Sequence, residues 1–260
     1  MTSIIKKYKN PLIYLLTIIF VFLLWLVLSL LIDSSLILPS PVSSIKEIFY
    51  FFKDGSFYLS LLFTCLRAII AFIISFIVTL ILVLMSLNAT LRNVVKLITS
   101  ITRGIPTMAI ILILIIWMKP SIAPIIVATL VLIPILYEEF LTICDSFKSE
   151  FLPVILVYNI KKRDIIKLFF KEKMSNIFDF SASSLGFSLK LVISAEALAL
   201  SYYGLGSIMQ FSKIYLEMEK LFALAIIAVF LGLLLEVIIK SLKRWFLKIN
   251  DWRFKFNYRL

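Results

Sequence analysis

Histidine is absent from the 260 residues, and charged side chains make up only 16% of them. The absence of histidine removes the commonest general base and the commonest metal ligand. Hydrophobic residues make up 62% of the chain, against about 45–50% in an average soluble domain. Such a chain has too little polar surface to enclose its apolar residues in water. This composition excludes an ordinary soluble enzyme, a disordered protein and a secreted disulfide scaffold, and leaves a multi-span membrane protein.

Cysteine is also scarce. Cys65 and Cys144 stand alone in apolar runs, without the spacing of metal ligands or of a disulfide framework. We interpret both as small core hydrophobes. The sequence shows no phosphate-binding loop, metal site or catalytic triad, so we expect no catalytic, cofactor-binding or metal-binding residues. The chain is therefore not expected to be an enzyme or to hydrolyse ATP itself.

Apolar runs long enough to cross a bilayer, which takes about 20 residues in a helix, recur along the chain. They lie at residues 11–32, 68–91, 97–117, 121–144, 180–200 and 221–240. Lys119-Pro120 separates the third run from the fourth as a tight hairpin, because proline stops a helix from continuing. The predicted fold class is an all-α integral membrane protein with six transmembrane helices, in a single domain over residues 1–260.

The basic residues indicate the orientation of these spans. Most of the 27 Lys and Arg lie in the two terminal tails and in the loops after the second and fourth spans. Short loops rich in Lys and Arg stay in the cytoplasm. We therefore expect both termini to be cytoplasmic, in a multi-pass protein of the plasma or inner membrane. The net charge of +12 then reflects topology and attraction to the anionic headgroups of the lipid bilayer, and predicts no nucleic-acid partner.

The longest connection on the cytoplasmic side covers residues 145–176. Apolar residues recur there at helical spacing, stop near Asn159 and then resume among Lys and Arg. The pattern predicts two short amphipathic helices meeting at a corner near Asn159, since asparagine tolerates the left-handed conformation. Two interpretations remain open, a helix lying on the bilayer surface and a docking surface for a soluble partner.

Four stretches together resemble a known family. They are LPSPV at 38–42, RGIPTMA at 103–109, AE at 195–196 followed by GLG at 204–206, and the segment 145–176. In this order, and with six spans, the chain resembles the permease subunit of type I ABC importers. Within that family it is similar to the branch that imports aliphatic sulfonates, taurine, nitrate and thiamine precursors.

The resemblance implies a type I ABC importer permease fold that forms the translocation path for a small polar solute. It implies a cytoplasmic ABC ATPase that binds ATP and Mg, an extracellular solute-binding protein, and a second permease copy or paralogue. It places the ATPase-coupling segment at Tyr158, Asn159, Ile160 and Lys161. The family's coupling loop reads Glu-Ala-Ala, then Gly, then Leu-Pro, and this chain lacks the small residues, the glycine and the proline.

Two other functions are considered beside the importer, the first because the coupling loop departs from the family's sequence. One is a non-transporting scaffold or assembly subunit of a membrane complex. The other, less favoured, is a membrane-embedded transferase, which requires clustered Asp, Glu or His near an interface. Copurification of an ATPase distinguishes the importer from both.

Charged residues inside spans are costly and mark function. Arg103, Lys190 and Glu196 are therefore candidates for the translocation path. Alternatively, the Arg103 side chain extends to the membrane–water interface, and Glu196 anchors a neighbouring helix. Lys190, near mid-span, favours an anionic cargo and opposes a cationic one. It has the alternative of an ion pair with Glu196 of a second subunit, or with Glu138 or Glu139.

Overall fold

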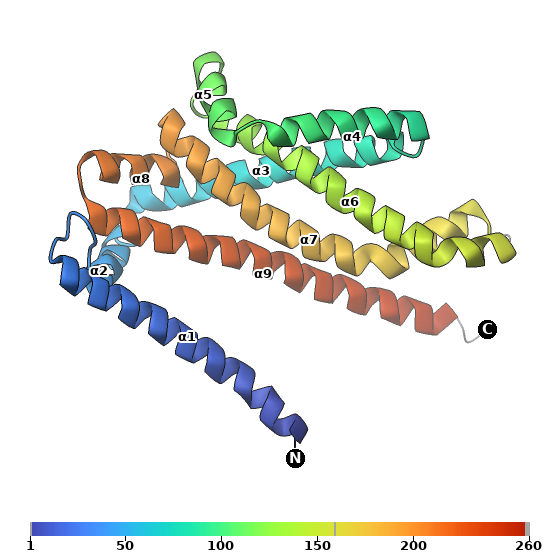
Figure 1. The fold of residues 1–260 in the computed structure, drawn as a ribbon, viewed down its shortest axis with the longest axis horizontal. Helices are drawn as coiled ribbons and strands as arrows, with labels where there is room; N and C mark the ends of the chain where they lie inside the picture. Colours follow the sequence, from blue (N-terminus) through green and yellow to red (C-terminus); the bar gives the residue numbers. More distant parts are fainter. Residues whose placement is uncertain (1, 159, 258–260) are drawn as a thin grey trace. The chain divides into compact units, whose positions relative to one another are not determined.

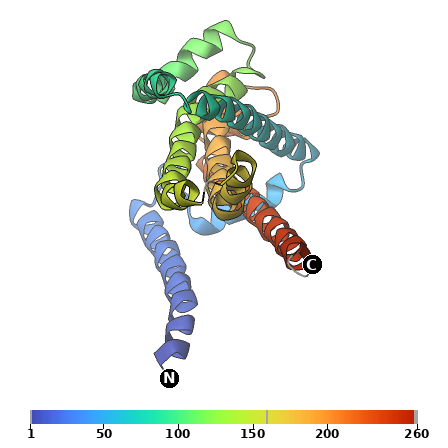
Figure 2. The same cartoon turned by 90° about the vertical axis from the view of Figure 1, so that its right-hand side faces the viewer.

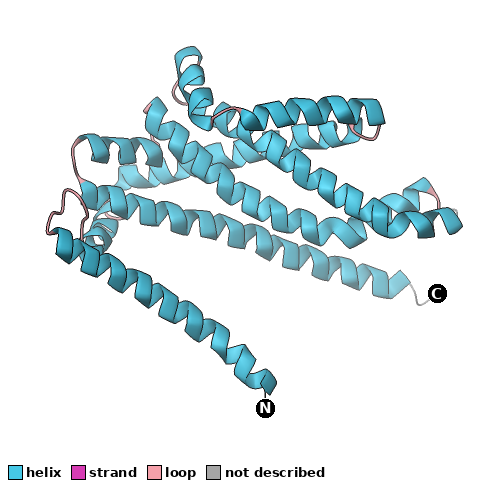
Figure 3. Cartoon of the chain, in the orientation of Figure 1, coloured by secondary structure: helices cyan, strands magenta, loops and turns pink. Residues whose placement is uncertain are grey.

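The computed structural model describes residues 2–158 and 160–257, with side chains described for 13–158, 160, 161 and 163–248. Within this part of the chain every regular element is a helix, and short loops join the helices (Figure 3). In chain order (Figure 1) they are α1 Thr2–Ile32, α2 Pro41–Phe51, α3 Gly55–Met85, α4 Ala89–Gly104, α5 Thr107–Trp117, α6 Ala123–Val157, α7 Lys162–Ala199, α8 Leu205–Ile214 and α9 Met218–Asn257.

Five of these helices, α1, α3, α6, α7 and α9, are long and apolar enough to cross a membrane. A sixth span results if the bent pair formed by α4 and α5 counts as one. The sequence thus predicted the membrane class and the approximate positions of the apolar helices. The ends of the helices differ from the prediction, and one predicted span is bent.

The second span differs at both ends. The prediction covered residues 68–91, but α3 runs from Gly55 to Met85. At its start, the Asp54 carboxylate accepts hydrogen bonds from the Ser56 hydroxyl and N–H, which lower the pKa of Asp54. After its end, the Asn88 side chain accepts the N–H of Thr90 and caps α4. Arg67 consequently lies inside a membrane helix and not before it.

The third span is not the single straight helix predicted for 97–117. α4 and α5 meet at an angle of 89°. Pro106 offers no N–H to a continuing helix, and Ile105 before it is extended at φ −77° and ψ 125°, as a residue preceding proline prefers. The bend leaves Arg103 in the last turn of α4.

The segment 145–176 does not form two separate short helices. Its first part is the end of the 35-residue α6 and its second part is the start of the 38-residue α7. The helices are separated by residues 158–161. Asn159, the predicted corner, lies outside the described residues.

The chain divides into two compact units. The first contains residues 1–58 and 208–227, and the second residues 59–207 and 228–260. In the first unit the Trp25 ring lies 5.7 Å from that of Phe222, and its Nε1 donates to the carbonyl of Pro39. Ser40 caps α2 by accepting the N–H of Ser43.

The second unit is built around the α6–α7 hairpin, whose helices lie side by side in Figures 1 and 2. The Phe140 and Phe180 rings, 4.8 Å apart, set the register between the two helices. Gly186 of α7 faces Gly232 of α9, and a Cβ on Gly186 would lie 3.8 Å from the Gly232 carbonyl oxygen. The largest fully buried apolar and aromatic side chains of the hairpin are Val127, Leu132, Leu136, Tyr137, Leu189 and Val192.

Candidate functional site

One face of α7 is polar and exposed along most of the helix. Its exposed residues recur every three or four positions, which places them on one side of an α-helix. They are Asn176, Asp179, Ser183, Phe187, Lys190 and Ser194. Hydrocarbon does not solvate such a face, so it faces water or protein. We call these six residues the polar face of α7.

Lys190 is the charge nearest the middle of this face. It lies nine residues before the helix ends at Ala199, which is about 13.5 Å along the axis at 1.5 Å per residue. That is close to half of the roughly 30 Å thickness of the hydrocarbon core. Among the described residues, the Lys190 ammonium has no carboxylate or hydrogen-bond partner.

Glu196, by contrast, is completely buried and fully paired. Its Oε1 lies 2.6 Å from Nη1 of Arg67 on α3. The hydroxyl of Thr64 donates to the carboxylate at 2.9 Å, and the N–H of Gly206 donates at 3.2 Å. These partners satisfy a carboxylate that would otherwise be very costly to bury.

Arg67 also holds the loop between α7 and α8. Its guanidinium donates to the carbonyl of Tyr202 at 2.8 Å and to that of Tyr203 at 2.9 Å. The Thr64 hydroxyl accepts the N–H of Leu205. Arg67, Thr64 and Glu196 therefore form one clamp, which fastens α3, α7 and the loop that follows α7.

The two glycines of the GLG stretch fit closely around this clamp. A Cβ on Gly206 would lie 2.0 Å from the carbonyl oxygen of Ile193, and a Cβ on Gly204 would lie 2.8 Å from the Glu196 carboxyl carbon. Neither glycine has a positive φ, so space and not backbone conformation calls for glycine here.

Arg103 lies at the α4–α5 bend. Its Nη2 donates to Glu138 Oε1 on α6 at 3.3 Å, and both side chains are partly exposed. A basic residue in the last turn of a helix also complements the helix dipole. The structure thus separates the three sequence candidates, because Arg103 and Glu196 pair with residues other than Lys190.

The turn between α6 and α7 presents apolar side chains. Val157 and Tyr158 are 79% and 75% exposed, Ile160 is half-buried and Lys161 is exposed. Behind the turn, the Phe147 ring lies 5.2 Å from that of Phe169 and the Lys173 ammonium lies 2.7 Å from Glu150, so the two helices are held together. Exposed basic residues surround the turn, and they are Lys161, Arg163, Lys167 and Lys171.

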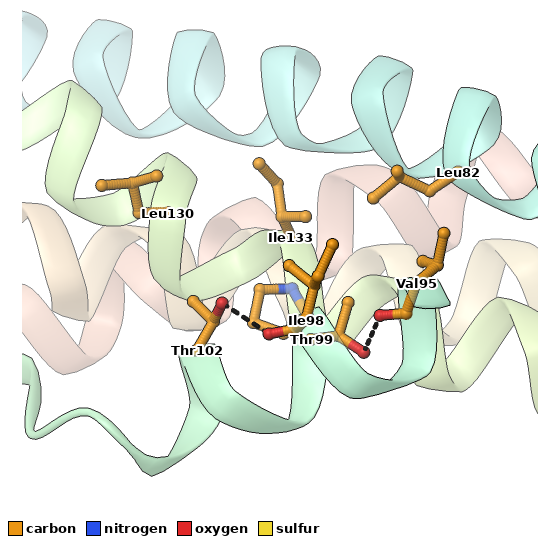
Figure 4. A pocket seen from close by; sticks show the side chains of 8 residues that line it. Leu82, Val95, Ile98, Thr99, Thr102, Leu130 and Ile133 are labelled. Carbon is orange, nitrogen blue, oxygen red and sulfur yellow. Dashed lines mark hydrogen bonds between the residues drawn. The ribbon is translucent and has the colours of Figure 1, made fainter. Parts of the chain in front are cut away.

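A groove lies between α3, α4 and α6 (Figure 4). Leu82, Ile98 and Ile133 are among its lining residues. The hydroxyls of Thr99 and Thr102, which also line it, donate to carbonyls of their own helix. The groove therefore offers apolar contact and is not a polar solute site. In the described part of the chain, no group of three or more Cys, Asp or Glu is arranged to hold a metal ion.

Sequence reasoning missed Arg67 and Thr64. The prediction started the second span at Ala68, one residue beyond the arginine. A basic residue next to a charge-free apolar run was the available signal.

Helices that are long and apolar enough to cross a bilayer define a multi-pass membrane protein. A sequence model of the family described as binding-protein-dependent transport system inner membrane component matches residues 75–248. Because the match covers more than half of the chain, the chain belongs to this family. No curated protein and no solved structure matches it.

The family defines the chain as an inner-membrane permease component of a type I ABC importer. Components of this kind take part in transport and are not typically enzymes.

Proposed function

We propose that the chain lines the solute path of its importer with the polar face of α7, and that a cytoplasmic ATPase drives it through the α6–α7 turn. The observation that carries the proposal is the run of polar residues along α7. A lipid-facing lysine near the bilayer centre is strongly unfavourable, whereas a water-filled path solvates it.

A second permease, either another copy of this chain or a paralogue, faces α7 across that path. An extracellular solute-binding protein delivers the solute from the end of α7 that carries the Glu196 clamp. Both termini and the α6–α7 turn then lie in the cytoplasm, in agreement with the basic residues around the turn. The LPSPV and GLG stretches favour the sulfonate, taurine, nitrate and thiamine-precursor branch.

The exposed turn supports ATPase docking. Val157 and Tyr158 present apolar surface at a helix end that points away from the membrane in this orientation. A partner that covers these side chains removes that surface from water. The Phe147 ring contacts the Phe169 ring and joins the two helices behind the turn. We expect a push on the turn to be transmitted along α6 and α7. Transport then follows alternating access, with ATP binding and hydrolysis moving the two permeases.

The test is ATP hydrolysis by the purified assembly. An affinity-tagged chain is isolated from membranes of its native host, and the eluate is assayed for ATPase activity. We expect Tyr158→Glu together with Ile160→Glu to remove the activity while the chain still inserts. The matched control is Leu87→Glu, since Leu87 is 80% exposed in the short connection between α3 and α4.

Loss of activity with both Leu87→Glu and the turn variants would argue against docking at the turn. An assembly that contains the chain but never hydrolyses ATP would overturn the importer mechanism and favour a scaffold subunit.

A further inference from the structure

Lys190 differs from Arg67, the basic residue of α3, and from Arg103, the basic residue in the last turn of α4. Each of these has a carboxylate partner inside the chain, Glu196 and Glu138 respectively. Lys190 is exposed, and no described residue pairs with it. A charge kept unpaired near mid-membrane has its counter-charge outside the chain.

In a second copy of this chain, the three carboxylates that the sequence offers as partners of Lys190 do not supply that counter-charge. Glu196 is buried with Arg67, and Glu138 is held by Arg103. Glu139 is exposed, but it lies at the wrong depth. Phe140 faces Phe180, so Glu139 is level with residues near 181 of α7. A two-fold axis along the membrane normal preserves depth, which leaves Glu139 of another copy about 13 Å from Lys190 along the helix.

The neighbours of Lys190 on the polar face are two serines and an aromatic ring. The Ser194 hydroxyl donates to the carbonyl of Lys190 at 2.9 Å, and the Ser183 hydroxyl donates to that of Asp179 at 3.3 Å. Both hydroxyl protons are therefore used within α7. The three N–H donors of the Lys190 ammonium remain available on this stretch.

From this arrangement we propose that Lys190 binds the anionic group of the transported solute, a carboxylate, sulfonate or phosphate, at mid-membrane. The inference rests on the proposed function, because it requires the polar face of α7 to line the path. An ammonium in a narrow path attracts anions and repels cations. During its passage, the solute's negatively charged group forms an ion pair with the Lys190 ammonium, which has no partner within the described chain.

The test uses charged thiol reagents in membranes that contain the full-length chain. Ser194→Cys is introduced with Cys65 and Cys144 replaced by alanine. Ser194 is four residues from Lys190 on the same face, about 6 Å away. The anionic sulfonatoethyl and the cationic trimethylammonioethyl methanethiosulfonates are compared, each relative to its rate with a free thiol in solution. We expect the anionic reagent to be favoured about tenfold.

Adding Lys190→Met is expected to abolish that preference, and Lys190→Arg to preserve it. Higher ionic strength should reduce it, because mobile ions screen the charge. The matched control is Ile77→Cys on the apolar exposed side of α3, 53% exposed, which we expect to react with neither reagent.

The outcomes separate the two proposals. If Ser194→Cys reacts with both reagents equally, or keeps its preference after Lys190→Met, the anion site is overturned while the water-filled path stands. If Ser194→Cys reacts with neither reagent, or no faster than Ile77→Cys, the path along α7 is overturned and the anion site with it.

Discussion

The Arg67 guanidinium and the Glu196 carboxylate meet at 2.6 Å, with both side chains buried, and join α3 to α7. Thr64 and Gly206 complete the hydrogen bonds of the carboxylate. The pair contacts the loop between α7 and α8 through the carbonyls of Tyr202 and Tyr203, and the start of α8 through the N–H of Gly206. One ion pair therefore positions two helices and that loop. We expect removal of this ion pair to destabilise the fold, with any effect on transport secondary to that.

Arg67→Met should therefore destabilise the protein strongly. Removing one partner of a buried ion pair leaves an uncompensated charge, which typically costs about 3–5 kcal/mol. Thermal unfolding of the purified chain in detergent measures the effect. The double variant Arg67→Met with Glu196→Met is expected to be less destabilised than Arg67→Met alone, because it leaves no buried charge.

Arg103→Met is the matched control for this experiment. Its ion pair with Glu138 is partly exposed, and such pairs contribute about 1 kcal/mol or less. Equal destabilisation by Arg67→Met and Arg103→Met would contradict the burial argument.

Gly206→Ala should lower stability, whereas Gly186→Ala should not. The added methyl at Gly206 would meet the Ile193 carbonyl at 2.0 Å, a clash that only backbone movement relieves. At Gly186 the closest atom is the Gly232 carbonyl oxygen at 3.8 Å, an ordinary contact. Alanine also favours a helix interior over glycine by about 1 kcal/mol. The two melting temperatures, measured in the same detergent, should shift in opposite directions or only at Gly206.

The sequence predicted the helical membrane class because apolar runs of span length are a local property of the chain. It also identified Glu196 as costly to place in a membrane, because a charged residue inside an apolar run is likewise a local feature of the sequence. It did not predict the partner of Glu196, because Arg67 is 129 residues away and no periodicity connects the two positions. The bend before α5 could have been predicted, because Pro106 lies inside the predicted third span and proline interrupts a helix. The prediction gave more weight to the apolar content of residues 97–117 than to this proline.

The sequence placed Lys190 among the candidates for the translocation path, but it could not show which other residues of the helix share its exposed side. Only the packing of α7 against α6 and α9 decides which side of α7 remains open. The Phe140–Phe180 contact and the contact of Gly186 with Gly232 are parts of that packing. Ser183 and Ser194 already lay in the predicted fifth span, residues 180–200, and the packing of α7 leaves them exposed on the same side as Lys190.

The predicted orientation is open to a labelling test. In a chain without Cys65 and Cys144, Lys161→Cys and Lys248→Cys should react with a membrane-impermeant thiol reagent only from the cytoplasmic side. Ser43→Cys and Lys213→Cys should react only from outside. The physical basis is the excess of Lys and Arg on the predicted cytoplasmic loops. Reaction of Lys161→Cys in intact cells would contradict the orientation and would also remove the α6–α7 turn from the reach of an ATPase.

Lys190→Met should not destabilise the protein as Arg67→Met does, although both changes remove a basic residue from a membrane helix. Lys190 has no partner in the described chain, so its removal strands no buried carboxylate. A lysine near the helix centre costs about 2.5–3.5 kcal/mol on insertion scales, so expression is expected to stay equal or rise. The melting temperature is expected to stay equal, because water solvates the Lys190 side chain in the folded protein.

Uptake, measured in cells that contain the whole importer, is expected to fall with Lys190→Met at unchanged protein level, and Lys190→Arg should retain part of it. Unchanged uptake kinetics in Lys190→Met would remove the residue from the path. A loss of stability as large as that of Arg67→Met would instead indicate that Lys190 has a structural partner in the assembly.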